Sequence, residues 1–202
     1  MGGQLGWRGC ECMQIGSQTI HLKRWSALQH DDAAMMAAVD AIFFESSNTK
    51  SFACEADRTA FRHRWLGRYL DDFPELAHVL SVGCALNPDT LAGYVIGAHH
   101  DPALTDRYDD IGYFHLLADL TRRYPAHLHI NLRHDLRGRG YGSVLIERFV
   151  DDVRAAGLPG VHVVTGAAMR NAGFYRRNGF DFSQTFPWKG NELVFLGRNA
   201  AA

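Results

Sequence analysis

Short apolar runs, separated by turn-forming residues, follow one another along the whole chain. Near the N-terminus, Ile20 and Leu22 alternate with polar neighbours, which is typical of a strand with one buried face. In the N-terminal half, short strand-like runs predict strands at residues 19–25, 78–86 and 91–98. Longer stretches predict helices at residues 33–44 and 57–70. Asp31 and Asp32 precede the first helix, where acidic side chains are favourable. The last two strands are joined by the turn-forming sequence Asn-Pro-Asp-Thr, so we expect them to form a hairpin.

The pattern is clearest in the C-terminal half, where apolar residues recur at helical spacing between residues 142 and 156. Here we expect a strand at 126–133, a helix at 142–156, a strand at 160–165, a short helix at 171–178 and a closing antiparallel pair at 180–186 and 193–196. A strand, a helix and a strand in this order form a right-handed crossover between parallel strands. The chain is therefore predicted to be an α/β protein built on a mixed sheet. Residues 101–124 are assigned only some helical character around Leu116 to Leu120.

Length and composition favour one domain. The chain has 202 residues, of which 47% are hydrophobic, and we expect a single domain at residues 17–200. Residues 1–16 begin with a Gly-rich, patternless stretch and are predicted to be a disordered leader, with Met13 as an alternative start to Met1. No apolar stretch reaches the roughly 18 residues that span a bilayer, and the N-terminus lacks a signal-peptide core. We therefore expect a cytoplasmic protein with no membrane partner.

Charge and cysteine content argue against several other classes of function. Lys and Arg number 21 and Asp and Glu 22, so the net charge does not favour a nucleic-acid partner. The four cysteines are too irregularly spaced for a disulfide framework or for paired zinc ligands. A metal cluster of His99, His100 and Asp101 with the histidines of strand 126–133 is disfavoured, because adjacent histidines point to opposite faces of a strand. We expect no metal site.

The segment Arg137-Gly138-Arg139-Gly140-Tyr141-Gly142 lies between the predicted strand at 126–133 and the predicted helix at 142–156. Its alternating glycines allow successive backbone N–H groups to turn toward one point, and the helix adds its positive N-terminal end. Arg137 and Arg139 supply positive charge, so the segment suits a diphosphate. A Walker A loop is excluded because no Gly-Lys-Ser/Thr is present, and the dinucleotide fingerprint is excluded because the glycines run GxGxG. The alternative is a glycine-rich segment that serves only a tight turn.

Two motifs resemble those of the GNAT superfamily of GCN5-related N-acetyltransferases. Arg137-x-x-Gly140-x-Gly142 is similar to the acyl-CoA signature of that family, and residues 171–180, NAGFYRRNGF, are similar to its NxxxFYxxxGF segment. The resemblance is clear over residues 124–186 and rests on element order before that. It implies a mostly antiparallel sheet flanked by helices, with the fourth and fifth strands splayed apart, and acetyl-CoA as the acyl donor.

The resemblance also implies roles for individual residues. The pantetheine arm would bond to the backbone of the strand at 126–133, and the pyrophosphate would lie in the glycine loop. The implied cofactor-binding residues are Ile130, Leu132, Arg137, Gly138, Arg139, Gly140, Tyr141, Gly142, Ser143, Asn171 and Phe174. In the direct attack of an amine on the thioester, Tyr175 would protonate the leaving thiolate and the Leu132 N–H would stabilise the oxyanion. The alternative for Tyr175 is simple core packing.

For the general base, the sequence offers His127 and His129. They alternate along one strand and so face the same side, and imidazole titrates in the useful range. We place His129 slightly ahead, and the alternative is that both are structural histidines in a partly buried sheet. The expected acceptor is a primary amine of a small molecule or protein, and the oligomeric state is left open between a monomer and the homodimer that is common in the family. The residues that suggest an amine pocket are Phe43, Phe44, Glu45, Asp109, Asp110 and Trp188.

A second class of function is kept open by residues 124–130, Tyr-Pro-Ala-His-Leu-His-Ile. This segment is similar to the acetyltransferase-like domain attached to some bacterial O-GlcNAc hydrolases. It indicates a CoA-binding or interaction module with little or no turnover. The intact donor motif favours retained cofactor binding and leaves the choice between the two classes to experiment.

Overall fold

The computed structural model describes residues 10–28, 33–83 and 85–200. Contacts divide the chain into two compact units, the first formed by the residues up to 96 with 130–145 and the second by 97–129 with the residues from 146 on. The predicted acidic first turn at Asp31 and Asp32 lies outside the described residues. The expectation of one domain at residues 17–200 stays a prediction.

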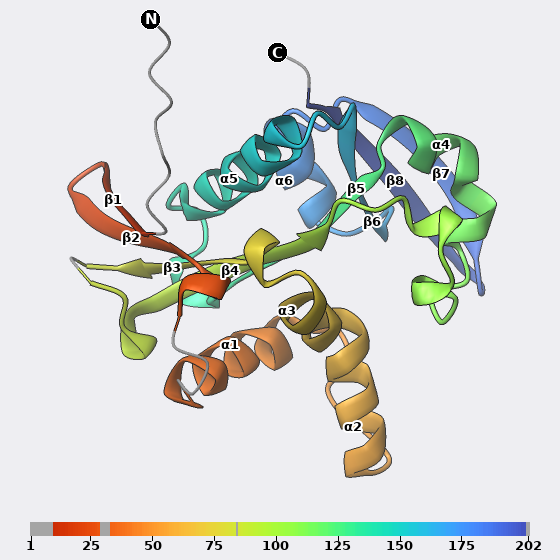
Figure 1. Cartoon of the computed structure of the whole chain (residues 1–202). Helices are drawn as coiled ribbons and strands as arrows, with labels where there is room; N and C mark the ends of the chain where they lie inside the picture. Colours follow the sequence, from red (N-terminus) through yellow and green to blue (C-terminus); the bar gives the residue numbers. More distant parts are fainter. Residues whose placement is uncertain (1–9, 29–32, 84, 201–202) are drawn as a thin grey trace, which may run out of the picture. The chain divides into compact units, whose positions relative to one another are not determined.

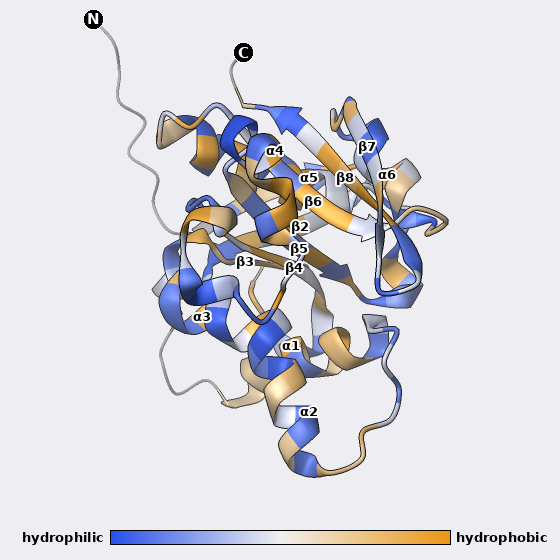
Figure 2. Ribbon diagram, turned by 90° about the vertical axis from the view of Figure 1, so that its right-hand side faces the viewer, coloured by the Kyte–Doolittle hydropathy of each residue, from blue (hydrophilic) through white to orange (hydrophobic). Residues whose placement is uncertain are grey.

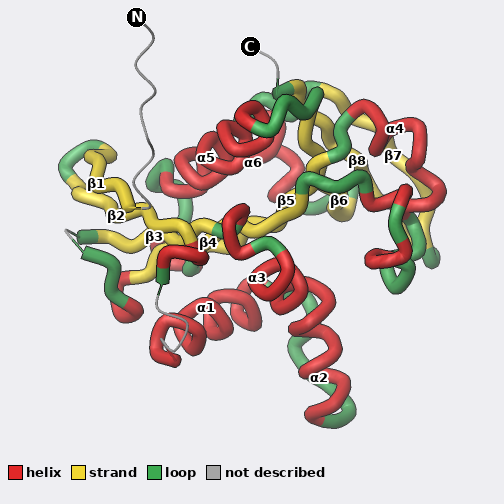
Figure 3. The backbone as a smooth tube through the Cα atoms, in the orientation of Figure 1, coloured by secondary structure: helices red, strands yellow, loops and turns green. Residues whose placement is uncertain are grey.

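Eight strands form one sheet in the order β1-β2-β3-β4-β5-β6-β8-β7 (Figures 1 and 3). Their bounds are β1 Cys10–Ile15, β2 Gln18–Arg24, β3 His78–Val82, β4 Leu91–Ala98, β5 Ala126–Leu132, β6 Gly160–Gly166, β7 Phe182–Trp188 and β8 Asn191–Asn199. The pair β5–β6 is parallel, whereas β1–β2, β2–β3, β3–β4, β6–β8 and β7–β8 are antiparallel. This arrangement confirms the predicted mixed, mostly antiparallel sheet with its parallel crossover and its β3–β4 hairpin.

Three helices of the first unit lie along one face of its strands in Figure 1: α1 Ala33–Ser46, α2 Glu55–Arg62 and α3 Arg68–Asp72. The helix α1 buries Met35, Val39, Ile42 and Phe43, which recur at helical spacing. The helix predicted at 57–70 is interrupted by a π-helical turn at His63–Gly67. Such a turn carries i→i+5 hydrogen bonds, and apolar periodicity does not reveal the extra residue that it accommodates.

In the second unit, the predicted helices and strands are found within a few residues of their expected ends. The helix α5, Tyr141–Ala155, begins in the first unit, and its continuation buries Ile146, Phe149, Val150 and Val153. Figure 2 shows apolar residues along the middle of β8, where Val194 to Gly197 are buried. Residues 101–124 form short 3-10 turns followed by α4, Ala118–Arg123. The helix α6, Asn171–Arg177, ends before Gly179, whose φ of 78° suits a helix stop.

Two glycines of β4 allow the backbone of β5 to approach closely. A Cβ atom at Gly93 would lie 2.4 Å from the Asn131 carbonyl oxygen, and one at Gly97 would lie 2.2 Å from the His127 carbonyl oxygen. Either contact is far inside van der Waals distance, so only glycine fits at these positions. The close approach of β5 to β4 therefore depends on Gly93 and Gly97, which have no side chain.

The parallel pairing of β5 with β6 covers only one end of the strands. Its register joins Ala126 to Val161 and His127 to His162 and goes no further in this described part of the chain. In contrast, β6 pairs with β8 along its whole length, from Gly160 to Gly166. The two central strands thus separate after His127, as the resemblance to GNAT proteins implies.

The strand β1 occupies residues that the sequence pattern assigned to a disordered leader. Cys10–Ile15 pairs antiparallel with β2, and the turn between the strands contains Gly16 at a φ of 58°. The half-buried Met13 and Ile15 alternate with the exposed Cys12 and Gln14, a period-2 pattern too short to stand out beside the Gly-rich start. The leader prediction is corrected for residues 10–15, and residues 1–9 lie outside the described part.

Candidate active site

The glycine loop of the first unit has the backbone conformation that its sequence demands. Gly138 has a φ of 77° and Gly140 a φ of 89°, in the left-handed region that residues with a Cβ atom rarely adopt. No atom lies within 4 Å of a Cβ built on Gly138, so conformation, and not crowding, requires glycine there. Residues 137–140 are exposed, whereas Tyr141 and Gly142 are buried at the start of α5. The loop therefore exposes both its glycine backbone and the side chains of Arg137 and Arg139 to solvent.

The Arg137 N–H donates to the His134 carbonyl oxygen at 3.4 Å, whereas the N–H groups of residues 138–142 precede the first hydrogen bonds of helix α5. Its first hydrogen bonds run from Ser143 N and Val144 N to the Gly140 carbonyl oxygen, at 3.0 and 3.3 Å. The N–H groups of the preceding residues lie outside the helical ladder, where helices leave donors for anions. The first turn contains no acidic residue that would oppose an anion. This combination suits a phosphate group.

The two arginines of the loop are tied to its own flanks. Arg137 donates from Nε to the Leu132 carbonyl oxygen at 3.0 Å and from Nη2 to Ser46 Oγ at 3.1 Å. Arg139 donates from Nη2 to the Asp135 carbonyl oxygen at 3.1 Å. These bonds keep both guanidinium groups beside the loop. The contact with Ser46 also joins the end of α1 to the end of β5, a link that the sequence does not reveal.

Residues at the end of β5 form hydrogen bonds with α1, the glycine loop and β4. Ile130 and Leu132 are half-buried, and the Leu132 carbonyl oxygen also accepts from Ser46 Oγ at 3.5 Å. The next residue, Arg133, donates its N–H to the Ala92 carbonyl oxygen of β4 at 2.9 Å. Two polar side chains therefore donate hydrogen bonds to the Leu132 carbonyl oxygen. The N–H group of the same residue is the one that, according to the resemblance, would stabilise the oxyanion.

In the second unit, α6 carries the other predicted site residues. Tyr175 is 6% exposed, and its ring packs edge-on against Phe180 and Phe174. Burial raises the pKa of Tyr175 above its ordinary value, so the phenol stays protonated at neutral pH. Asn171 is exposed and its Oδ1 accepts from Thr165 Oγ1 at 3.0 Å, which joins the start of α6 to the end of β6.

The two candidate histidines occupy different environments. His127 is 2% exposed, and its ring lies 4.9 Å from the ring of Tyr108 and 5.6 Å from that of Phe114 between centroids. His129 is half-buried on the same face of β5, with its ring centroid 6.4 Å from that of His127. A general base must reach both substrate and solvent, so His129 is the better placed of the two.

The residues suggested as an amine pocket are divided between the two units, with residues 43–45 in the first and residues 109, 110 and 188 in the second. Phe43 is buried in the core, while Phe44 lines a pocket of the first unit. The Glu45 carboxylate contacts Nδ1 of His134, and Asp109 Oδ1 lies 2.9 Å from His115 Nε2. Trp188 packs edge-on against Tyr113. Phe44 and Glu45, which each line a pocket of the first unit, therefore keep a direct case for ligand contact.

Comparison with known proteins decides the family. The sequence matches the Acetyltransferase (GNAT) family over residues 43–180, more than half of the chain. This chain belongs to the GNAT acetyltransferase family. The narrower resemblance to the domain of O-GlcNAc hydrolases stays a prediction.

Solved structures agree with the GNAT fold. SsHAT is 24% identical with a TM-score of 0.65 and covers 91% of this chain and 99% of its own. A GNAT-family protein from Desulfovibrio desulfuricans is 19% identical with a TM-score of 0.57, covering 90% and 99%. The protein yncA from Salmonella typhimurium, in a structure with its cofactor acetyl-CoA, is 14% identical with a TM-score of 0.50, covering 90% and 94%. At these identities the likeness shows the fold.

Among residues 10–28, 33–83 and 85–200, none of the helices is both long and apolar enough to cross a bilayer. Over the same ranges, no three side chains of His, Cys, Asp or Glu gather closely enough to hold a metal ion.

Proposed function

We propose that this GNAT protein transfers an acetyl group from acetyl-CoA to a primary amine by direct attack, in the cytoplasm. The observation that carries the proposal is the loop at 137–142, where two left-handed glycines and two exposed arginines stand at the N-terminus of α5. Backbone donors, a helix N-terminus and local positive charge are together what a diphosphate requires.

The donor site is assigned to the residues of the acyl-CoA signature and the strand before it. The loop from Arg137 to Ser143 would bind the pyrophosphate, and the backbone of Ile130 and Leu132 would bind the pantetheine arm. Asn171 and Phe174 would contact the arm from α6. The separation of β5 from β6 after His127 supports this assignment, because a released strand edge offers backbone groups to a ligand.

Three groups would carry the chemistry. His129 would accept a proton from the attacking ammonium, directly or through water, and its half-buried position supports this role. The Leu132 N–H would stabilise the tetrahedral oxyanion. Tyr175 would give its proton to the departing thiolate, and its raised pKa keeps that proton in place before the bond breaks.

The test compares Tyr175→Phe with the wild type in acetyl-CoA binding and in thiol release over an amine panel. We expect kcat to fall at least about 100-fold, in the range typical of a lost general acid, with the Kd for acetyl-CoA unchanged. Tyr113→Phe is the matched control, because Tyr113 is also buried with a raised pKa and has no assigned role. Equal losses in the two variants would contradict the role of Tyr175.

The second candidate is a CoA-binding or interaction module without turnover. The same experiment separates it from the enzyme: tight acetyl-CoA binding with no thiol release for any amine would favour the module. A chain that does not bind CoA at all would overturn both functions.

A further inference from the structure

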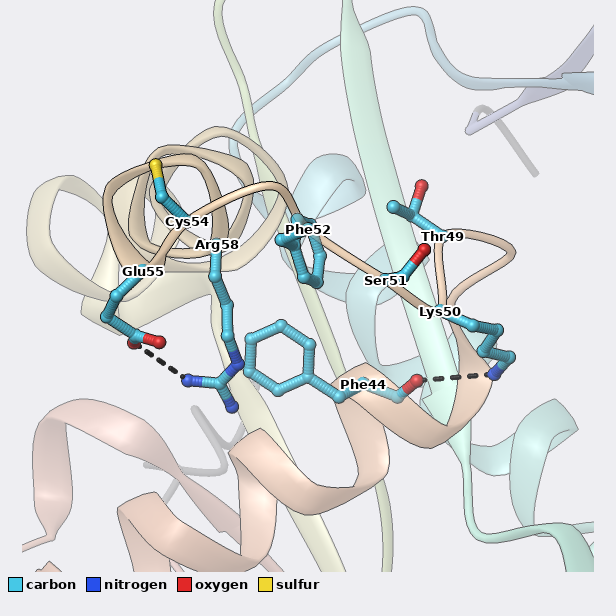
Figure 4. Close-up of a pocket in the computed structure, with 8 residues that line it drawn as sticks. All are labelled: Phe44, Thr49, Lys50, Ser51, Phe52, Cys54, Glu55 and Arg58. Atoms are coloured by element: carbon cyan, nitrogen blue, oxygen red, sulfur yellow. Dashed lines mark hydrogen bonds and ion pairs between the residues drawn. The ribbon is translucent and has the colours of Figure 1, made fainter.

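A pocket of the first unit lies outside the donor loop and is lined by residues 44–58. Its volume is about 440 Å³, within the range of small-molecule sites, and it is open to solvent. The lining residues are Phe44, Thr49, Lys50, Ser51, Phe52, Cys54, Glu55 and Arg58 (Figure 4). The pocket thus combines two aromatic rings, two cations and one carboxylate.

The aromatic wall of the pocket is held by a cluster of four phenylalanines. Phe44 and Phe52 lie edge to face with centroids 6.1 Å apart. Behind them, Phe43 packs against Phe44 at 5.0 Å and Phe61 packs against Phe52 at 5.3 Å. Because Phe43 is a core residue of α1, the two pocket rings are anchored to the core of this unit.

Hydrogen bonds hold Arg58 and Lys50 in place but engage only some of their N–H donors. The guanidinium carbon of Arg58 lies 3.9 Å from the centroid of the Phe44 ring, and Arg58 Nη1 donates to Glu55 at 3.2 Å. That bond engages one of the five N–H donors of a guanidinium. Lys50 Nζ donates to the carbonyl oxygens of Phe44 and Glu45 at 3.3 and 2.7 Å, which accounts for two of its three protons. Figure 4 shows the Arg58 guanidinium beside the Phe44 ring and the Lys50 ammonium at the Phe44 main-chain carbonyl, whereas Cys54 points away from the ring.

The pocket begins close to the predicted donor site within the same unit. Phe44 stands two residues before Ser46, whose hydroxyl contacts both the Leu132 carbonyl oxygen and Arg137. The lining therefore starts where α1 meets the end of β5. Phe44, which lines the pocket, and Ser46, which contacts the end of β5, therefore both belong to the last turn of α1.

We infer that this pocket binds the acceptor, and that the acceptor carries a carboxylate together with an aromatic or large apolar group, as an aromatic amino acid does. This inference rests on the proposed function. Arg58 and Lys50 exceed Glu55 by one positive charge, so the lining favours an anion. A guanidinium fixed on an aromatic face offers a preorganised fork for a carboxylate. The rings of Phe44 and Phe52 would contact the apolar part.

Direct binding tests the pocket without any turnover. The probes are 3-phenylpropionate, its neutral isostere 3-phenylpropanol, and acetate, which lacks the ring, each titrated by NMR into the whole chain. We expect 3-phenylpropionate to bind at least about tenfold more tightly than the other two, because a hydrogen bond to a charged group is worth that much. Equal binding of the three probes would overturn the inference.

Substitution of Arg58 localises the binding. We expect Arg58→Gln to weaken 3-phenylpropionate binding about tenfold and Arg58→Lys, which keeps charge without the planar fork, to weaken it less. Arg122→Gln is the matched control, because Arg122 forms the same exposed i,i+3 pair, with Asp119 at 3.2 Å, in the other unit. The same loss in Arg122→Gln would show that the effect is not local and would overturn the site.

Acceptor kinetics test whether the ligand is the substrate. L-Phenylalanine and 2-phenylethylamine differ in the carboxylate alone, and we expect kcat/KM for the amino acid to be at least about tenfold higher, with Arg58→Gln removing the difference. Turnover of 2-phenylethylamine as fast as of L-phenylalanine, or of other amines only, would overturn the acceptor assignment. Absence of acetyl-CoA binding would instead end the proposed function, while the probe titrations would still decide the pocket.

Discussion

His127 and His129 are two residues apart, yet their side chains meet different surroundings. His127 lies among the rings of Tyr108, Phe114 and His162, as a packed residue of the second unit. His129 is partly exposed. A general base must come within hydrogen-bond reach of its substrate, so the partly exposed ring is the better placed of the two for that role.

Substitution separates these two histidines. We expect His129→Gln to lower kcat by at least about tenfold, with the effect largest near neutral pH, and to leave the free energy of unfolding unchanged. His127→Gln should lower the free energy of unfolding by about 1–3 kcal/mol, because it disturbs a buried, packed side chain. Thiol-release kinetics and urea unfolding measure the two effects. A loss of stability without a loss of kcat in His129→Gln would contradict its role as the base.

Sequence could predict those site residues whose role depends on local backbone. Gly138 and Gly140 are needed where φ is positive, and this need leaves a direct trace in the sequence. Lys50, Phe52 and Arg58 leave no such trace, because their pocket arises from the path of a loop after α1. Ser46 was missed for a similar reason, since its partners Leu132 and Arg137 are distant in the chain.

At the scale of elements, one arginine joins three segments of the second unit. Arg198 of β8 donates from Nη1 and Nη2 to the two carboxylate oxygens of Glu147 in α5, at 2.7 and 2.8 Å. It also donates to the Asn178 carbonyl oxygen, just after α6, at 2.8 Å. The guanidinium beside Glu147 lowers the pKa of that carboxyl group. The end of α6, and with it Tyr175, is therefore fastened to α5 and β8.

Loss of this arginine should loosen α6. We expect Arg198→Met to lower the free energy of unfolding by about 1–2 kcal/mol, a discounted value because Glu147 is half exposed, and to speed amide exchange across residues 171–178. Arg154→Met is the control, because Arg154 joins α5 to the Ala200 carbonyl oxygen without touching α6. Unchanged exchange in α6 of Arg198→Met would show that the helix is held by its packing alone.

Most elements could be predicted because a continuous apolar run, as in β4, or an apolar periodicity, as in α5, extends over their whole length. Two were not. The strand β1 is defined by its pairing with β2, a contact between strands that a single short segment does not encode. The π-helical turn at His63–Gly67 depends on the hydrogen bonds of one turn, which periodicity averages over.

At the scale of the whole molecule, one buried histidine links stability to pH. His162 is fully buried, stacks on Phe195 with centroids 4.6 Å apart, and its Nδ1 is hydrogen-bonded to the Tyr124 carbonyl oxygen. Burial lowers the pKa of His162 from 6.5 to about 4. Between these two pH values, the imidazole of His162 is therefore protonated in the unfolded chain and neutral in the folded chain. The stability from the neutral ring is complete above pH 6.5 and is lost as the pH falls toward 4.

The expected loss is large enough to measure. Between pH 7 and pH 4, the wild type should lose about 3 kcal/mol of unfolding free energy more than His162→Phe, which keeps an aromatic ring against Phe195 but does not titrate. Urea unfolding at the two pH values gives the comparison, and carboxylates contribute equally to both proteins. Parallel losses in the two proteins would show that His162 is charged in the folded state or already neutral in the unfolded one.

The pocket of the first unit is lined by a single uninterrupted stretch of the chain, residues 44–58. The residues that select the acceptor are then encoded by one short segment of the gene. A recombination event that exchanged this segment would change the acceptor specificity while leaving the donor loop at 137–142 unaltered. New acceptor preferences could arise by exchange of this segment, without matched substitutions elsewhere in the chain.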